Sequence, residues 1–322
     1  MAMGGHDFSA TTADNYRVFA AEAAGRSPRY QRLALAVAGD VRVLDFLATL
    51  PTAKRQPNLL FAAARYLLGE PPDLAALHAL LSDQEDELAE VMLARRTQTN
   101  EPARCATLLP ALALLPQPLA LVEVGASAGL TLLADRYSYD YDGHRVAGTD
   151  PRAPVLACQP RGPVPLPEKV PDVVWRAGLD LNPLDVTNDD DVRWLRCLVW
   201  PGETGRQERL SQAIETARRD PPRLYRGDLV TDLPGVIGDA PPGAAVVVYH
   251  SAVLAYVRQA DRVRFAETVS EMDAVWLSNE APGVLPDIDA AKADAHGFLL
   301  VRDGTKPLAV TDSHGTWVEW LG

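Results

Sequence analysis

The sequence predicts an α/β fold in which a doubly wound, mostly parallel sheet with an antiparallel edge hairpin follows an all-α N-terminal domain. Three observations support this prediction. Residues 1–115 show apolar side chains at helical spacing and no strand-like alternation. From Pro118 onward, short apolar runs alternate with helical stretches, which is typical of a parallel sheet with helices on both faces. The last two apolar runs are joined without a helix, as in an antiparallel pair.

Length, charge and cysteine usage exclude several classes of protein. A chain of 322 residues is long enough for two packed units. It carries 31 Lys and Arg against 43 Asp and Glu, a net charge of −12, which disfavours nucleic acid because phosphate affinity depends on basic residues. The 3 Cys and 6 His have no metal-binding spacing. The chain has neither an apolar run of about 20 residues, as a membrane span needs, nor a signal-peptide pattern at residues 1–10. We expect a cytoplasmic protein without a metal or a membrane partner.

Capping signals divide the first 115 residues into several helices. Asp14 is placed to begin a helix that ends at Gly25, and Ser27-Pro28 gives a cap followed by proline at the first helical position. Gly69 is placed to end a later helix. Asn100, followed by Glu and Pro, reads as one more helix start. We therefore predict a helical cap domain over residues 1–115.

The rest of the chain, residues 116–322, reads as the sheet domain. Residues 137–170 are rich in Tyr, Pro and Gly without a clear period, so we expect an insertion there. Apolar runs predict the strands, which we place at 119–124, 173–181, 223–229, 245–250, 274–278, 297–302 and 317–321.

A glycine-rich turn follows the first predicted strand. The segment Glu123-Val-Gly-Ala-Ser-Ala-Gly129 precedes a helix expected over residues 128–136. Small residues let a backbone approach a ligand, and a helix N-terminus presents unpaired N–H groups. The segment is not a P-loop, because no Gly-Lys-Ser/Thr follows, and it departs from GxGxxG at Ser127 and Leu130. A tight turn with a structural role is the alternative.

Polar residues follow the other predicted strands. Asp180 ends the second, Asp228 the third and His250 the fourth, while Asn279-Glu280 follows the fifth. Open α/β sheets bind ligands at these carboxyl ends. His250 is a candidate catalytic base or substrate orienter, the alternative being a hydrogen-bonded histidine in the floor of a cleft. Glu280 is a candidate for substrate binding or proton extraction, the alternative being a solvated loop.

Two family resemblances follow from these fragments. Roughly residues 118–322 resemble the class I S-adenosylmethionine-dependent methyltransferases. The resemblance is carried by four fragments, which occur in the order EVGxSxG, GLDLNP, RGDLVTDLP and VVVYHSAVLAYV. Nearly the whole chain resembles an uncharacterised bacterial family, domain of unknown function 2332. The fragments that carry this resemblance include TQTNEPARCATLLP at 97–110 and LVEVGASAGLTLLADRYSYDY at 121–141. The first resemblance implies a Rossmann-like, methyltransferase-type domain.

The methyltransferase resemblance also implies roles for matched residues. S-adenosylmethionine would be the cofactor, with its methionine part over Gly125, Ser127 and Gly129 and with Glu123 just before the turn. Asp180 would hold the ribose hydroxyls, and Asp228 would meet the adenine amino group with Leu229 against the ring. If the second strand is instead Tyr137–Tyr141, the ribose acid becomes Asp140 or Asp142. We prefer Asp180 because the whole GLDLNP fragment fits a strand end.

We therefore expect an S-adenosylmethionine-dependent methyltransferase with a small-molecule acceptor. The alternative is a catalytically inactive protein of this fold that binds a nucleoside ligand or another protein. The helical region would pack over the carboxyl ends of the strands and exclude water, with Asn100 and Arg104 in the pocket wall. Otherwise it would form a separate domain, for example for assembly into a homodimer.

Overall fold

A computed structural model of the chain describes residues 11–285, 288 and 297–321. These residues form a mixed α/β fold that divides into two compact units. One unit holds residues 100–187 and 209–321, and the other holds residues 11–99 and 188–208. The boundary expected at residue 115 therefore falls within the sheet unit. Residues 1–10, where we expected no signal peptide, lie outside the described residues.

The second unit consists of helices from both segments of the chain. Its helices are α1 (Thr12–Ala23), α2 (Pro28–Val37), α3 (Val41–Thr49), η1 (Thr52–Lys54), α4 (Pro57–Leu68), α5 (Leu74–Asp83), α6 (Glu85–Ala94) and α8 (Asp189–Leu198). Gly69 ends α4 at φ +80°, and Pro28 begins α2, both as the sequence predicts. Thr11 rather than Asp14 caps α1. The helix expected at Asn100 begins at Arg104, as α7 (Arg104–Ala113).

The later segment is fixed to the N-terminal helices by specific polar contacts. The indole of Trp194 donates to the carbonyl of Arg96 across 3.0 Å, and the indole of Trp200 donates to Asn58 Oδ1 across 2.8 Å. Arg95 pairs with Asp191 at 2.8 Å. Residues 188–208 therefore complete the helical unit, although the sequence places them between two strands of the sheet.

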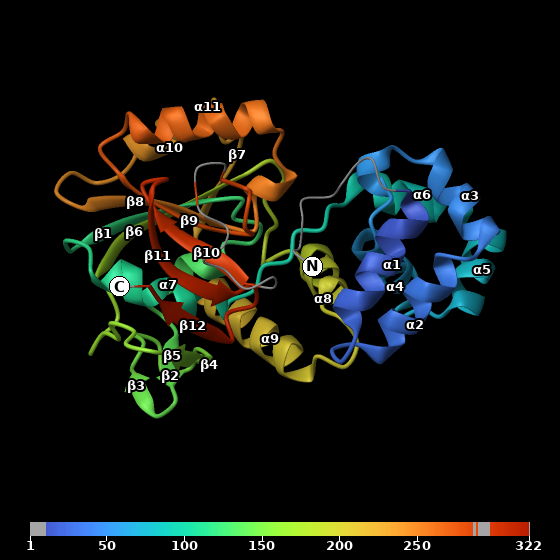
Figure 1. The fold of residues 1–322 in the computed structure, drawn as a ribbon, viewed down its shortest axis with the longest axis horizontal. Helices are drawn as coiled ribbons and strands as arrows, with labels where there is room; N and C mark the ends of the chain where they lie inside the picture. The colour runs from blue at the N-terminus through green and yellow to red at the C-terminus, as the bar shows by residue number, and fades with distance from the viewer. Residues whose placement is uncertain (1–10, 286–287, 289–296, 322) are drawn as a thin grey trace. The chain divides into compact units, whose positions relative to one another are not determined.

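Most of the described strands of the sheet unit belong to a nine-stranded main sheet in the order β5-β12-β11-β10-β9-β8-β1-β6-β7 (Figure 1). In chain order they are β1 (Leu119–Val124), β5 (Gln159–Arg161), β6 (Val173–Asp180), β7 (Arg223–Arg226), β8 (Ala245–Ser251), β9 (Val275–Glu280), β10 (Gly297–Arg302), β11 (Lys306–Asp312) and β12 (Trp317–Trp320). Strands β7, β6, β1, β8 and β9 are parallel neighbours. Their order reverses between β1 and β8, and this reversal is the switch point at which open sheets bind ligands.

The antiparallel edge is larger than the expected hairpin. The sequence predicts that residues 297–302 and 317–321 pair with each other, but β11 lies between β10 and β12. Strand β11 was missed because Lys306-Pro307 at its start reads as a turn. The expected insertion contains β5 and a separate described sheet of β2 (Ser138–Tyr141), β3 (His144–Val146) and β4 (Val155–Ala157).

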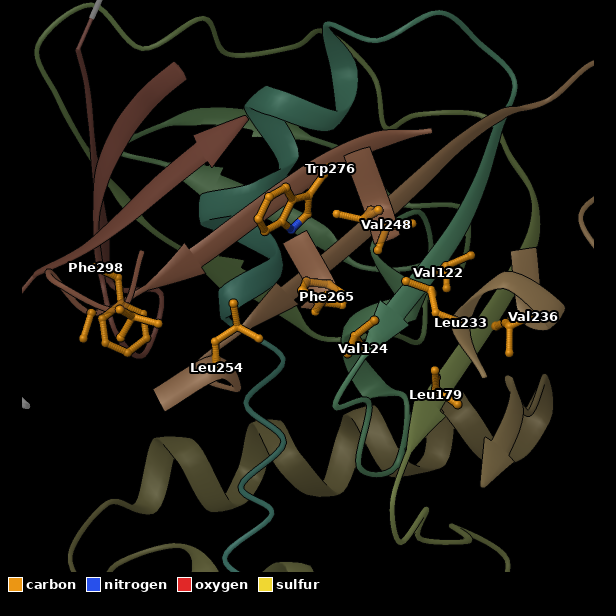
Figure 2. Packing of buried hydrophobic residues seen from close by; sticks show 14 residues of the cluster. Val122, Val124, Leu179, Leu233, Val236, Val248, Leu254, Phe265, Trp276 and Phe298 are labelled. Carbon is orange, nitrogen blue, oxygen red and sulfur yellow. The ribbon is translucent and has the colours of Figure 1, made fainter. Parts of the chain in front are cut away.

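One face of the main sheet packs against α10 (Leu233–Gly238) and α11 (Gln259–Ser270). Figure 2 shows this core, in which Val122 and Val124 of β1 lie with Leu233, Phe265 and Trp276. Side chains alternate along a strand, so Glu123 points to the opposite face. On that face, η2 (Leu130–Leu133) packs against β1, and α7 packs against β11.

Only the short 3-10 helix η2 forms where the sequence predicts a helix over residues 128–136. Buried tyrosine hydroxyls satisfy carbonyls that a longer helix would use. Tyr137 donates to the Leu130 carbonyl across 2.7 Å, and Tyr139 donates to the Ala134 carbonyl. Tyr141 donates to the Ala106 carbonyl of α7 across 2.6 Å. The three tyrosines therefore stabilise backbone rather than present a platform to a substrate.

Candidate functional site

The glycine turn, Gly125–Gly129, follows β1 at the switch point. Its backbone is left-handed at Gly125 (φ +71°), Ser127 (φ +53°) and Gly129 (φ +70°). A residue with a β-carbon in this conformation costs about 1–2 kcal/mol. Contacts from outside the turn must therefore hold Ser127 in place.

The backbone N–H groups of Gly125, Ser127 and Gly129 donate to acceptors within the protein. Gly125 donates to the Leu179 carbonyl across 2.8 Å, and Ser127 donates to Asp180 Oδ2 across 2.8 Å. Gly129 donates to a carbonyl of the turn itself across 2.7 Å. The expectation that a helix N-terminus presents unpaired donors here is wrong for these three groups. An anion site of the phosphate-binding kind needs such donors, so these groups do not form one.

Neighbouring side chains fill the space that the two outer glycines leave. A β-carbon at Gly125 would lie 2.5 Å from Val253 Cγ2, and one at Gly129 would lie 2.6 Å from Pro222 Cγ. Both distances are too short for a real contact, so each position requires glycine. The sequence suggested that a ligand fills the space beside Gly125, but Val253 occupies it.

Asp180 lies at the carboxyl end of β6, the neighbour of β1. Its carboxylate accepts from Ser127 N and, across 2.7 Å, from Asn182 N. The side chain is partly exposed. Asp180 thus stabilises the glycine turn and also reaches the surface beside it.

The alternative ribose acids lie elsewhere in the sheet unit. Asp140 is on β2, in the small sheet, and accepts from Gly143 N across 2.8 Å. Asp142 occupies the turn that follows β2, with φ +50°. Because the strand beside β1 is β6 rather than residues 137–141, the assignment of the second strand to residues 173–181 is confirmed.

Asp228 follows β7 and is exposed. Its Oδ1 accepts from Val230 N across 2.8 Å, so the carboxylate stabilises its own turn. Leu229 is half-buried against the core. Strand β7 pairs with β6, with Arg226 opposite Asp180, so the two acids end neighbouring strands at one edge.

Glu123 is buried, with an exposed fraction of 4%. Burial raises the pKa of its carboxyl to about 8, against the opposing effects of a hydrogen bond from the Thr131 hydroxyl and of the charge of Arg104. Thr131 donates to Oε1, while Oε2 has no hydrogen-bond partner within the described residues. Near neutral pH this carboxyl is mainly protonated. It faces η2 rather than the exposed edge of the sheet.

Asn100 and Arg104, the expected pocket-wall residues, lie close to the carboxyl edge of the sheet. Asn100 Oδ1 accepts from Leu130 N across 2.7 Å, directly after the glycine turn. Arg104 donates to the carbonyls of Ser251, at the end of β8, across 3.0 Å and of Ser313, after β11, across 2.9 Å. Both side chains fix backbone segments at this edge.

His250 is fully buried, and both ring nitrogens have partners. The indole of Trp276 can only donate, and it donates to Nε2 across 3.0 Å. The ring hydrogen is therefore on Nδ1, which donates to Glu280 Oε1 across 2.7 Å. With Nε2 occupied, this imidazole has no open nitrogen for a substrate proton. The geometry corresponds to a hydrogen-bonded histidine, the alternative that the sequence left open.

Glu280 is buried rather than solvated. Its Oε1 accepts from His250 and from two backbone amides, Val253 N across 2.8 Å and Leu254 N across 3.0 Å. The carboxylate therefore holds the gate loop, which we define as Ser251–Leu254. Since Val253 of this loop covers Gly125, His250 and Glu280 act on the glycine turn through the loop.

A family model described as "Uncharacterized protein conserved in bacteria (DUF2332)" matches residues 13–320. The chain belongs to the DUF2332 family. Neither the curated proteins nor the solved structures give a significant match to it. The matched range includes the described parts of both units, so the glycine turn, the gate loop and the helices are all features of a DUF2332 chain.

No pattern in the sequence predicts the gate loop of this DUF2332 chain. Val253 lies in a run, Ala252–Val257, whose spacing predicts a helix, but only the 3-10 turn η3 (Leu254–Tyr256) forms there. Ala252 has φ +59°, a conformation that non-glycine residues rarely adopt. The sequence makes Asn279, together with Glu280, a candidate for substrate binding, with a solvated loop as the alternative. Asn279 is instead fully buried on β9, and its main-chain carbonyl accepts from Ala252 N across 3.1 Å.

In the described part of this DUF2332 protein, no three His, Cys, Asp or Glu side chains lie together as a metal site would require. Among the same residues, no helix combines the length and apolar character of a membrane span. The polar groups that reach the surface at the carboxyl edge include Asp180, Asn182 and Asp228.

Proposed function

We propose that this protein binds S-adenosylmethionine at the carboxyl ends of β1 and β6 and transfers its methyl group to a small-molecule acceptor. The observation that carries the proposal is the position of Asp180. This acid ends the strand beside β1, contacts the glycine turn at 2.8 Å and remains partly exposed. A carboxylate so placed can accept hydrogen bonds from the two hydroxyls of a ribose.

The order of the parallel strands supports a nucleoside ligand. Numbered along the chain, the parallel strands β1, β6, β7, β8 and β9 are arranged 3-2-1-4-5. Folds with this order bind nucleotide cofactors at the switch point beside the first strand. The support from the strand order is by analogy, whereas the support from Asp180 comes from its position and contacts.

The bonded amides of the turn favour a cofactor without phosphate. NAD and similar dinucleotides place a pyrophosphate on free backbone donors. Gly125 and Ser127 have already given their donors to Leu179 and Asp180. S-adenosylmethionine has no phosphate, so its ribose and adenine can be held by side chains such as Asp180, Asp228 and Leu229.

When bound, S-adenosylmethionine supplies a methyl group activated by a sulfonium. The chain then has to align the acceptor and exclude water. Asp180 would hold the ribose, and Asp228 would accept from the adenine amino group. Arg104 and Asn100 would fix the backbone segments that surround the ligand.

A nucleoside-binding protein without catalysis is the second candidate. The observation that favours it is the His250 network, which leaves neither ring nitrogen open. Catalysis would then need its proton acceptor elsewhere, or an acceptor substrate that is already deprotonated. Binding and methyl transfer are therefore tested separately.

The binding test compares thermal unfolding with S-adenosylmethionine, with its demethylated product, and with NAD and ATP as phosphate-bearing controls. A ligand at one hundred times its Kd adds about 2.7 kcal/mol, which shifts the melting temperature visibly. We expect a shift with the first two compounds and a smaller one or none with the controls. A shift with NAD alone, or with none of the four compounds, refutes the proposal.

A methyl-transfer assay separates the two candidates. Transfer of a tritiated methyl group from S-adenosylmethionine to one of a set of small amines, thiols and phenols, with release of the unlabelled demethylated product, indicates an enzyme. Binding of both compounds without any transfer supports the nucleoside-binding candidate. Asp180→Asn should weaken binding in either case, and Asp140→Asn is the matched control.

A further inference from the structure

The side chain of Val253 covers the face of the glycine turn. A β-carbon at Gly125 would lie 2.5 Å from Val253 Cγ2 and 2.8 Å from Cγ1, so the isopropyl group packs directly on the glycine. Gly125 itself is only half-buried. Val253 therefore lies at the accessible side of the turn, where a ligand beside Asp180 would approach.

The gate loop is held in this position by several contacts. Glu280 Oε1 accepts from Val253 N at 2.8 Å and from Leu254 N at 3.0 Å, and His250 Nδ1 donates to the same oxygen at 2.7 Å. Leu254 is fully buried in the core, where Figure 2 shows it near Phe265.

The backbone of the loop is also unfavourable in isolation. Ala252 has φ +59°, which an alanine rarely adopts without support. Concentrating three donors on Oε1 leaves Glu280 Oε2 buried without a partner among the described residues. The buried Glu280 carboxylate and the strained backbone of Ala252 therefore hold Val253 over Gly125. A bound ligand can change this conformation of the loop.

We propose that Val253 is a gate on the cofactor site and that Glu280 is the residue that positions it. This inference rests on the proposed function, because the ligand that opens the gate is S-adenosylmethionine. The gate is closed when the isopropyl group lies on Gly125. It opens when the side chain rotates or the loop moves, and the freed face of the turn then contacts the ligand.

The first experiment measures affinity for S-adenosylmethionine and its demethylated product by calorimetry in wild type, Val253→Ala and Val257→Ala. Val257 belongs to the same stretch of chain, and its substitution removes the same two methyl groups without touching Gly125. A gate that is closed most of the time reduces apparent affinity by the open fraction, so Val253→Ala should bind about five- to tenfold more tightly. Val257→Ala should match wild type.

The outcomes separate this inference from the proposed function. If wild type binds and Val253→Ala binds equally well or more weakly, the gate is refuted and the proposed function stands. If Val253→Ala binds and wild type does not, both are supported. If no variant binds, both are refuted.

A second experiment tests the role of Glu280 by combining hydrogen exchange of the free protein with ligand affinity. Hydrogen exchange at the amides of Val253 and Leu254 should become faster in Glu280→Gln than in wild type, because both amides donate to this carboxylate. The same variant should bind S-adenosylmethionine more tightly. A merely structural role predicts faster exchange with equal or weaker binding, and that result would overturn the assignment of Glu280.

Discussion

Ser127 donates its backbone amide to the carboxylate of Asp180 across 2.8 Å, and this bond joins the turn after β1 to the end of β6. The same carboxylate accepts from Asn182 N across 2.7 Å. The two bonds hold the carboxylate at the glycine turn, beside the position proposed for the ribose. Asp180 therefore combines a structural role with the proposed binding role.

Removing the Asp180 carboxylate is expected to affect both roles. Asp180→Ala leaves two backbone amides without their charged acceptor, so the free energy of unfolding should fall by about 1.5–3 kcal/mol. Affinity for S-adenosylmethionine should fall as well. Urea unfolding and calorimetry measure the two effects.

Asp140→Ala is the matched control for Asp180→Ala. It removes a carboxylate from the β2–β3 hairpin of the small sheet, away from the strand beside β1, so it should leave ligand affinity unchanged. Unchanged ligand affinity in Asp180→Ala, or a loss of affinity in Asp140→Ala, would contradict the assignment of the ribose site to Asp180.

The sequence predicted the parallel strands well because their signals are local. Strand β1 was placed at its observed residues, 119–124, because an apolar run lies between Pro118 and Gly125. The GLDLNP fragment likewise placed Asp180 at the end of β6. Local patterns assign residues 188–208 to the sheet domain, whereas these residues belong to the helical unit. The contacts of Trp194 with Arg96 and of Trp200 with Asn58 join parts of the chain that are far apart in sequence, so no local pattern could indicate them.

The gate loop was not predictable for a similar reason. His250 and Glu280 meet only because β8 and β9 are neighbours, and local patterns in one sequence do not show which strands pair. The contact of Val253 with Gly125 depends in turn on that pair. Ser127 and Ala252 adopt left-handed conformations that their residue types do not suggest, so local propensity gave no signal at either position.

The buried tyrosines should contribute to stability and not to binding. Tyr141→Phe removes the hydroxyl that donates to the Ala106 carbonyl across 2.6 Å. We expect the free energy of unfolding to fall by about 0.5–1.5 kcal/mol, measured by urea unfolding. Calorimetry should give wild-type affinity for S-adenosylmethionine. Weaker binding with unchanged stability would instead indicate an aromatic ligand platform.

Glu123 should make the stability of the protein depend on pH. Burial raises the pKa of this carboxyl from 4.5 to about 8 in the folded protein. Between these two pH values the folded state binds a proton that the unfolded chain has lost. The contribution of Glu123 to the free energy of unfolding therefore falls as pH rises through this window, by about 1.4 kcal/mol per pH unit.

Glu123→Gln cannot titrate and isolates this effect. The free energy of unfolding of Glu123→Gln minus that of wild type should increase from pH 5 to pH 8 and become constant at higher pH. Urea unfolding at a series of pH values measures it. A difference that does not change with pH would show that the Glu123 pKa is not raised.

The contact between Gly125 and Val253 is testable by a double-mutant cycle without any ligand. Gly125→Ala places a β-carbon where it would lie 2.5 Å from Val253 Cγ2, in a backbone conformation at φ +71°. The left-handed backbone costs about 1–2 kcal/mol and the overpacking about 1–3 kcal/mol, so the total loss should be about 2–5 kcal/mol. In a Val253→Ala background the overpacking is relieved, and Gly125→Ala should cost only the backbone part. Urea unfolding of the four proteins gives the coupling energy between the two positions. Equal costs of Gly125→Ala in both backgrounds would mean that Val253 does not cover the glycine turn in solution, and the gate would then have no structural basis.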